Sequence, residues 1–275
     1  MSDLGQVPEG INPHIPSVAR MYDYYLGGKD NFPSDREAAE KMIELGRQMG
    51  NDARQIAQEN RRFLGRAVRL LAEAGVRQFV DIGAGLPTQD NVHQVAQRHA
   101  PGARVVYVDN DPIVLTHARA LLARDSDVLA LHGDLRDSDA ILDDPRVREH
   151  LDLTQPFAVL LVAVLHFIPD DAEAGRIAAR VRDRLGPGGH LVLSHVYAGN
   201  SSMDMAKTGQ QVYSGTTSGG IARRGYDQIS GYFAGLELLA PGVVPVASWD
   251  PDAEPGSPID YDQPGILAGV ARVPG

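Results

Sequence analysis

The spacing of hydrophobic and polar positions changes near residue 76. Before that point, residues 52–74 carry apolar side chains at helical spacing, and residues 34–50 have the composition of an earlier helix. Ser34 followed by Glu37 is the pattern of a capping box, in which each side chain caps a backbone N–H of the other. We therefore predict a helical extension over residues 1–75.

After residue 75, short apolar runs alternate with stretches of helical spacing. The runs RQFVDIG, ARVVYVD, DVLALHGD, PFAVLLVAVLH and GHLVLSHV predict five strands, with helices at 88–100, 111–123 and 170–185 between them. Continuous runs of valine, leucine and isoleucine are typical of parallel strands that are buried on both faces. The pattern predicts a doubly wound, mostly parallel α/β fold.

The C-terminal third is less regular. We predict a helix at 226–235, a strand end in LELLAPGVV and a closing strand in ILAGVARV. The long Pro/Asp/Gly loop between these two strands fits an antiparallel hairpin at the sheet edge. The polar, Gly/Ser-rich residues 198–225 are interpreted as an insertion on the substrate side. The domain organisation expected is therefore an extension and lid (1–75) followed by one core (76–275).

Composition and charge limit the kinds of partner that the protein can bind. Of 275 residues, 43% are hydrophobic, yet no apolar run approaches the roughly 18 residues of a membrane helix. The first twenty residues lack the basic start and apolar centre of a signal peptide, so we expect a cytoplasmic protein. A net charge of −10 argues against a nucleic-acid surface and favours a small-molecule partner. The absence of cysteine excludes disulfides and thiolate zinc sites, and no other metal motif is present.

A glycine-rich turn follows the first predicted strand. In FVDIGAGLPTQD the strand ends at Asp81, Gly83 and Gly85 form the turn, and a helix is expected to begin near Thr88 or the next residue. Glycines there permit positive φ and a close approach of a ligand to the backbone. A tight turn with no ligand is the alternative interpretation of these residues.

The second strand strengthens the case for a nucleotide-type site. It ends in Asp109 and Asn110, some two dozen residues past the glycines, where Rossmann-type sites place an acid on ribose hydroxyls. A dinucleotide site would want a glycine at Thr88, and Asp81 would repel its pyrophosphate. A ligand with a cationic end, such as S-adenosylmethionine, suits Asp81 better.

The third and fourth strands bring further candidates to the same edge. Asp134 and Leu135 follow the third strand, where a carboxylate and a backbone group could meet an adenine ring. The alternative for Asp134 is an N-cap of the helix near residue 138. Ala163 and His166 follow the fourth strand, and His166 is the candidate general base, with simple packing beside Phe167 as its alternative.

These motifs carry a resemblance to a known class. FVDIGAG, VVYVDND, HGDLRD and VLHFIPDD resemble, in order, the cofactor motifs of class I S-adenosylmethionine-dependent methyltransferases. PSVARMYDYYLGGKDNF and NRRFLGRAV resemble a narrower group, the actinobacterial S-adenosyl methyltransferase family long catalogued as a domain of unknown function, DUF574. The resemblance implies a Rossmann-like, seven-stranded sheet. It also implies S-adenosyl-L-methionine as cofactor, with S-adenosyl-L-homocysteine as product, although Pro87 departs from the fuller glycine motif.

Within this class the segment before the first strand often folds over the cofactor. The stretch RMYDYYLGGKDNFPSDRE, residues 20–37, is interpreted as such a lid, whose aromatic faces shield a sulfonium while its polar groups meet the methionine end. The alternative is a tyrosine-rich helix packed on the core. The resemblance implies cofactor contacts from the lid and the following helix by Tyr22, Tyr25, Lys29, Asn31 and Arg61.

Three functions stay open at this point. The first is an S-adenosylmethionine-dependent methyltransferase acting on an unidentified, small acceptor. The second is a non-catalytic protein that binds S-adenosylmethionine, because the sequence reveals a cofactor half but no acceptor half. The third is an NAD(P)-dependent oxidoreductase, against which Thr88 and the absence of a hydride-transfer residue both argue. No coiled-coil or apolar surface stripe indicates an oligomeric state.

Overall fold

Three helices precede the sheet. The computed structural model describes residues 11–48, 50–87, 90–122, 125–200, 203–253 and 259–275. The first helices are α1 (Val18–Tyr25), α2 (Pro33–Gln48) and α3 (Ala53–Glu73), and the Asp52 carboxylate caps α3 by accepting the Arg54 N–H. The capping box predicted at Ser34 is wrong. The helix begins one residue earlier, and the Ser34 hydroxyl donates to the Pro13 carbonyl instead.

The sheet is mixed and mostly parallel. Its strands are β1 (Gln78–Ile82), β2 (Arg104–Asp109), β3 (Val128–His132), β4 (Ala158–Val162), β5 (His190–Tyr197), β6 (Glu237–Leu238), β7 (Val244–Pro245) and β8 (Gly265–Arg272). They lie in the order β3-β2-β1-β4-β5-β8-β6, and β7 shares the edge position beside β8. The predicted fold class is confirmed. The expected antiparallel pairing across the long loop is present, because β6 and β7 both pair with β8, but β8 lies one position inside the edge and also pairs antiparallel with β5.

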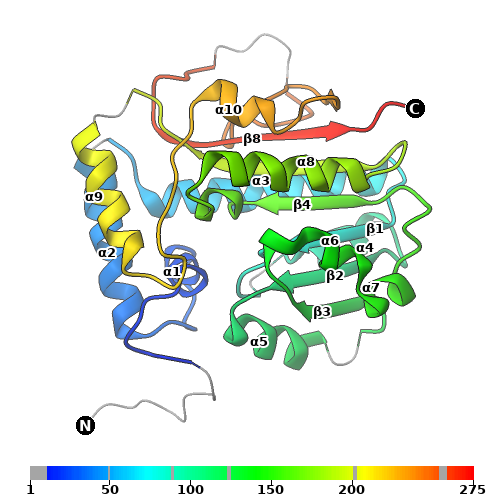
Figure 1. Cartoon of the computed structure of the whole chain (residues 1–275), viewed down its shortest axis with the longest axis horizontal. Coiled ribbons are helices and arrows are strands. Elements are labelled where there is room, and N and C mark those ends of the chain that lie inside the picture. Colours follow the sequence, from blue (N-terminus) through cyan, green and yellow to red (C-terminus); the bar gives the residue numbers. More distant parts are fainter. Residues whose placement is uncertain (1–10, 49, 88–89, 123–124, 201–202, 254–258) are drawn as a thin grey trace.

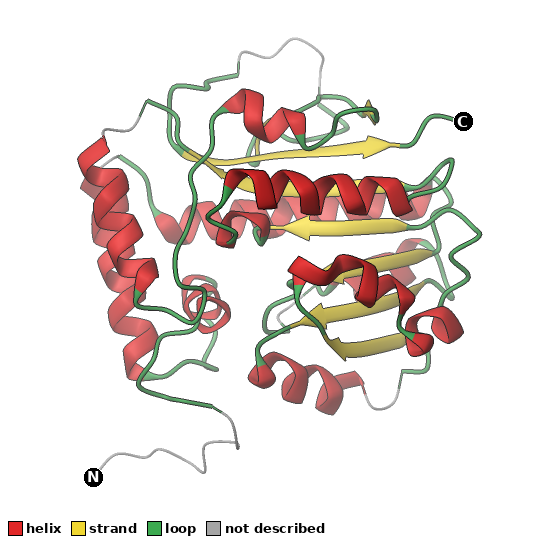
Figure 2. Cartoon of the chain, in the orientation of Figure 1, coloured by secondary structure: helices red, strands yellow, loops and turns green. Residues whose placement is uncertain are grey.

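Helices cover both faces of the sheet (Figure 2). Helices α3 and α4 (Val92–His99) pack on one face, and α6 (Ser138–Asp143), α7 (Pro145–His150), α8 (Asp171–Arg184) and α10 (Tyr226–Gly231) pack on the other. Helix α5 (Pro112–Leu122) lies against β2 and β3. The start of the helix predicted at Thr88 falls outside the described residues.

Alternate residues of each central strand enter opposite cores. In β1, Phe79 faces the α3 and α4 side, whereas Val80 and Ile82 face the α6 and α8 side. A strand buried on both faces needs apolar residues at successive positions, since side chains alternate across a sheet. This explains the continuous apolar runs in the sequence.

A separate group of helices stands at the carboxyl ends of the parallel strands. We call α1, α2 and α9 (Met203–Ser214) the helical cap. They lie together beside those strand ends in Figure 1 and share a small core that includes Met21, Ile43 and Tyr213. The N-terminal extension and the 198–225 segment thus contribute to one structure. No helix among the described residues is long and apolar enough to cross a membrane.

Candidate functional site

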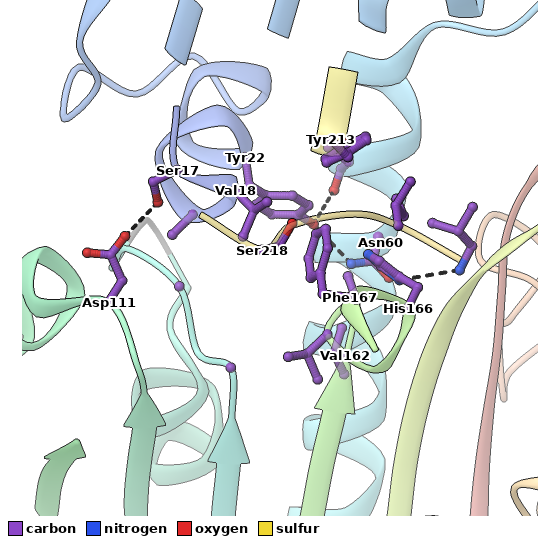
Figure 3. A pocket seen from close by; sticks show the side chains of 18 of the residues that line it. Ser17, Val18, Tyr22, Asn60, Asp111, Val162, His166, Phe167, Tyr213 and Ser218 are labelled. Carbon is purple, nitrogen blue, oxygen red and sulfur yellow. Dashed lines mark hydrogen bonds between the residues drawn. The ribbon is translucent and has the colours of Figure 1, made fainter. Parts of the chain in front are cut away.

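The helical cap and the carboxyl ends of the strands enclose a pocket of about 540 Å³ (Figure 3). All five parallel strands reach it directly or through the loop that follows them. Of the residues predicted from the sequence, twelve line it: Tyr22, Tyr25, Arg61, Asp81, Gly83, Gly85, Asp109, Asn110, Asp134, Leu135, Ala163 and His166. Lys29 and Asn31 do not.

The glycine turn is built as its sequence predicts. Gly83 and Gly85 have φ of +77° and +67°, a region that residues with a side chain rarely adopt. A Cβ on Gly83 would lie 2.3 Å from the Val164 side chain, so this glycine is also required by packing against the β4 loop. A Cβ on Gly85 would meet no atom within 4 Å, which leaves open space on the pocket side.

Asp109 at the end of β2 fixes this turn. Its Oδ2 accepts the Gly85 N–H at 2.9 Å and its Oδ1 accepts the Asp111 N–H at 2.9 Å. Burial raises the pKa of this carboxyl, and these backbone donors oppose the increase. Each carboxylate oxygen can accept a further hydrogen bond, so Asp109 can hold the turn and still receive donors from a ligand.

Asp81 at the end of β1 is buried without a hydrogen bond. It is 4% exposed, and no donor contacts its carboxylate among the described residues. Burial is the main cause that raises its pKa to about 7; Asp109 adds to the increase, and the nearby positive charge of Arg61 opposes it. A buried carboxylate is costly unless a cation or donors accompany it. The site is therefore suited to a positively charged ligand group.

A chain of hydrogen bonds runs from the sheet to the cap. Ala163, after β4, has a φ of +55°, a strained value for alanine. Its N–H donates to the Ser194 hydroxyl, which donates to the side-chain oxygen Oδ1 of Asn60 at 2.7 Å. The Asn60 amide donates to the Tyr22 hydroxyl, and this donates to the Ala57 carbonyl. Every donor has an acceptor, so the chain holds Tyr22 over the strand ends.

Asp134 is an N-cap, but of a different helix from the one near residue 138 that was its alternative interpretation. It is the N-cap of the short helix η1 (Leu135–Asp137), and its carboxylate accepts the Arg136 N–H at 2.9 Å and also contacts the Arg136 guanidinium. Asp137, rather than Asp134, caps α6. Both Asp134 and Leu135 nevertheless line the pocket, so capping does not remove them from the site.

His166 lies in the short helix η2 (Leu165–Phe167) and is 4% exposed. Its Nδ1 accepts the Val196 N–H at 3.4 Å, so the neutral ring carries its proton on Nε2. Burial holds its pKa well below the usual range, and His195 and Arg224 act in the same direction. A backbone donor on Nδ1 suits a neutral ring, and the role of general base predicted from the sequence stays a prediction.

The GGKDN break within residues 20–37 is a turn around Asp23. The Asp23 Oδ2 accepts the Asp30 N–H at 3.0 Å and the Asn31 amide at 2.8 Å. A Cβ on Gly28 would lie 1.9 Å from Asp23 Oδ1, so only glycine fits there. Asn31 thus serves this turn, and Lys29 is exposed outside the pocket.

The cap is tied down by a buried ion pair and one contact across the pocket. The Arg20 guanidinium lies 2.7 Å from the Asp35 carboxylate, and both side chains are almost fully buried. The Ser17 hydroxyl donates to Asp111 Oδ2 at 2.5 Å, which joins the start of α1 to the loop after β2. Beyond the cap, the Arg61 guanidinium of α3 donates to the Asp90 carbonyl in the loop before α4.

Several lining residues were missed in the sequence. Asn60 could have been noticed as a polar residue on the apolar stripe of α3, one turn from Ile56 and one turn from Leu64. The others carry no local signal, because distant segments bring them together: Ser17, Asp111, Phe167, Tyr213 and Arg223. No group of metal-ligating side chains occurs in the described part of the chain.

The strand order, the glycine turn and the pocket at the strand ends define a class I S-adenosylmethionine-dependent methyltransferase fold. A family model described as S-adenosyl methyltransferase matches residues 5–274. This chain belongs to the S-adenosyl methyltransferase family.

Solved structures agree with that membership. A candidate methyltransferase from Thermobifida fusca YX is 38% identical, with a TM-score of 0.87 over 98% of this chain and 99% of that one. A DUF574 family protein from Streptomyces avermitilis MA-4680 is also 38% identical, with a TM-score of 0.84 over 94% and 98%. An O-methyltransferase family protein from Burkholderia thailandensis, 15% identical with a TM-score of 0.50 over 92% and 71%, shares the fold. No curated protein matches.

Proposed function

We propose that this protein binds S-adenosyl-L-methionine in the pocket and transfers its methyl group to a small-molecule acceptor. The observation that carries the proposal is Asp81, a buried carboxylate that lacks a partner beside the glycine turn. A pyrophosphate would be repelled there, whereas the ammonium of a methionine moiety would supply the hydrogen-bond donor that Asp81 lacks, together with a positive charge. The same observation disfavours an NAD(P)-dependent oxidoreductase.

The other lining residues fit the rest of this cofactor. The space beside Gly85 admits a ligand against the backbone, and Asp109 and Asn110 offer acceptors to ribose hydroxyls. Asp134 and Leu135 stand where an adenine ring would lie at the end of β3. These assignments leave Lys29 and Asn31 out of the cofactor site.

The helical cap covers the pocket and contributes aromatic side chains to it. Tyr22 and Tyr25 line the pocket from α1, and aromatic faces stabilise a sulfonium by cation–π attraction. The hydrogen-bond chain through Asn60 fixes Tyr22, so its ring is held in place without rearrangement. We propose that the cap excludes water from the reacting centre.

S-adenosyl-L-methionine, when bound, supplies an electrophilic methyl group. The residues of this chain contribute by orientation, because placing the acceptor in line accounts for much of the rate of such a transfer. His166 lines the same pocket, and as a neutral ring it can donate from Nε2 to an oxygen of the acceptor. We propose an orienting role for it.

Two measurements test the proposal. Titration of the protein with S-adenosyl-L-homocysteine should give saturable binding that Asp81→Asn weakens. Incubation with S-adenosyl-L-methionine and pools of small metabolites should then release S-adenosyl-L-homocysteine in an acceptor-dependent way. Binding without release from any pool would favour the non-catalytic alternative, and absence of binding would contradict the proposal.

A further inference from the structure

Two neighbouring arginines at the end of the 198–225 segment have opposite surroundings. Arg224 is 1% exposed, and its guanidinium contacts the Asp171 carboxylate, the His195 ring and the Ile168 carbonyl. Arg223 lines the pocket, half-buried, and makes no hydrogen bond or ion pair within the described part of the chain. Its Nη1 is fully shielded from solvent yet lacks an acceptor.

An unpaired guanidinium in such a place is unfavourable. Burial lowers the pKa of Arg223, and the one opposing influence comes from the Tyr213 hydroxyl. The other arginines that line the pocket all have partners: Arg20 pairs with Asp35, Arg136 with Asp134, and Arg61 with the loop before α4. A charge retained without a partner in a pocket is best explained by a partner that arrives with the ligand.

The guanidinium lies on the cap side of the pocket. Its Nη2 lies 3.4 Å from where a Cβ of Gly209 would be, so it rests against α9, and the Met42 side chain of α2 lies 3.6 Å from the same point. The Tyr213 hydroxyl acts on the charge of this guanidinium, and the Tyr213 ring centroid lies 5.9 Å from that of Phe167, which also lines the pocket. Arg223 is thus set among apolar and aromatic side chains.

This place is separate from the proposed methionine site. Asp81 lies at the end of β1 beside the glycine turn, whereas the Arg223 guanidinium rests against α9 of the helical cap. The carboxylate on the same carbon as the methionine ammonium already has a cation at hand, because Arg61 lines the pocket close enough to Asp81 to act on its pKa. The partner of Arg223 therefore belongs to the second substrate.

We infer that the methyl acceptor is a small planar molecule that carries a carboxylate, and that Arg223 binds this carboxylate while Phe167 and Tyr213 contact its ring. A guanidinium matches a carboxylate with two parallel hydrogen bonds, and aromatic side chains favour a flat apolar body. This inference rests on the proposed function, because it assigns the acceptor half of the same pocket.

The test uses the full-length protein saturated with S-adenosyl-L-homocysteine. Matched pairs of probes differ only in charge: benzoate with benzamide, phenylacetate with phenylacetamide, and salicylate with salicylamide. Their binding is measured by ligand-observed NMR in the wild type, Arg223→Gln, Arg223→Lys and the control Arg176→Gln, an exposed arginine of α8 outside the pocket.

In the wild type, at least one carboxylate should bind about tenfold or more tightly than its amide, as a charged hydrogen bond predicts. Arg223→Gln should abolish that preference, Arg223→Lys should keep part of it, and Arg176→Gln should keep all of it. Affinity for S-adenosyl-L-homocysteine should remain unchanged in all variants, and the melting temperature should not fall in any of them.

Three results would overturn the assignment: no pair distinguished by the wild type, an unchanged preference in Arg223→Gln, or a loss of S-adenosyl-L-homocysteine affinity in that variant. The last would place the cofactor's own carboxylate on Arg223. If the wild type failed to bind S-adenosyl-L-homocysteine but still preferred carboxylates in an Arg223-dependent way, the proposed function would fail while the anion site stood.

Discussion

Asp81→Asn should strengthen the fold and weaken cofactor binding. The pKa of Asp81 rises from 3.8 to about 7 in the folded protein. Because a tenfold change in proton affinity corresponds to about 1.4 kcal/mol, ionising this buried carboxyl costs about 4 kcal/mol of folding free energy at about pH 8. The folded protein binds the proton more tightly than the unfolded chain, so stability is full below the unfolded pKa and falls as pH rises toward 7.

Asparagine has nearly the shape of the acid but cannot ionise. Asp81→Asn should therefore raise the free energy of unfolding by about 4 kcal/mol at about pH 8 and by about half as much at about pH 5.5, where the folded carboxyl is protonated but the unfolded one is still ionised. Denaturant unfolding at the two pH values measures this. Asp183→Asn, at an exposed position of α8, is the matched control and should show neither effect.

The same substitution should have the opposite effect on ligand binding and lower the affinity. A cationic ligand favours the ionised carboxylate, so wild-type affinity for S-adenosyl-L-homocysteine should fall about tenfold from pH 8 to pH 6 as the ionised fraction decreases. Asp81→Asn should show no such dependence on pH. Because it is titrated in the same buffers, it also controls for any change in the ionisation of the ligand itself. A variant that is less stable at pH 8 and binds as tightly as the wild type would refute the reasoning.

Three further outcomes follow from single contacts. Gly83→Ala should lower the melting temperature far more than Gly85→Ala, because only the first adds a clash to the cost of a positive φ. Asp35→Asn should destabilise the protein by roughly 3 to 5 kcal/mol in urea unfolding, since it leaves Arg20 as an unpaired buried charge. Asp109→Ala should weaken S-adenosyl-L-homocysteine binding by about 1 to 3 kcal/mol in calorimetry; unchanged affinity would show that it serves only the turn.

Local patterns in the sequence were sufficient for the sheet and the glycine turn. Gly83 and Gly85 are recognisable because the strand before them and the acid after the next strand lie at a spacing that the chain geometry dictates. The continuous apolar runs likewise follow from burial on both faces. The glycines of residues 20–37 also indicated a break in the helix there. They did not indicate that Asn31 would bind Asp23 within that turn.

Contacts between distant segments could not be predicted from local patterns in the sequence. Two examples are the ion pair between Arg20 and Asp35 and the hydrogen bond from Ser194 to Asn60. Nothing in the sequence around any of these residues indicates its partner. That Arg223 faces the pocket while its neighbour is fully paired depends on where the chain turns after α9. The short helix η1 was missed because three residues show no period, which gave Asp134 the wrong helix to cap.

The most direct test of the central claim is calorimetric titration of the purified protein, in parallel, with S-adenosyl-L-methionine, S-adenosyl-L-homocysteine and NAD. We predict saturable, one-to-one binding of the first two and no heat of binding from NAD. Binding of NAD in preference to both would contradict the account, because a pyrophosphate would then occupy the turn beside Asp81.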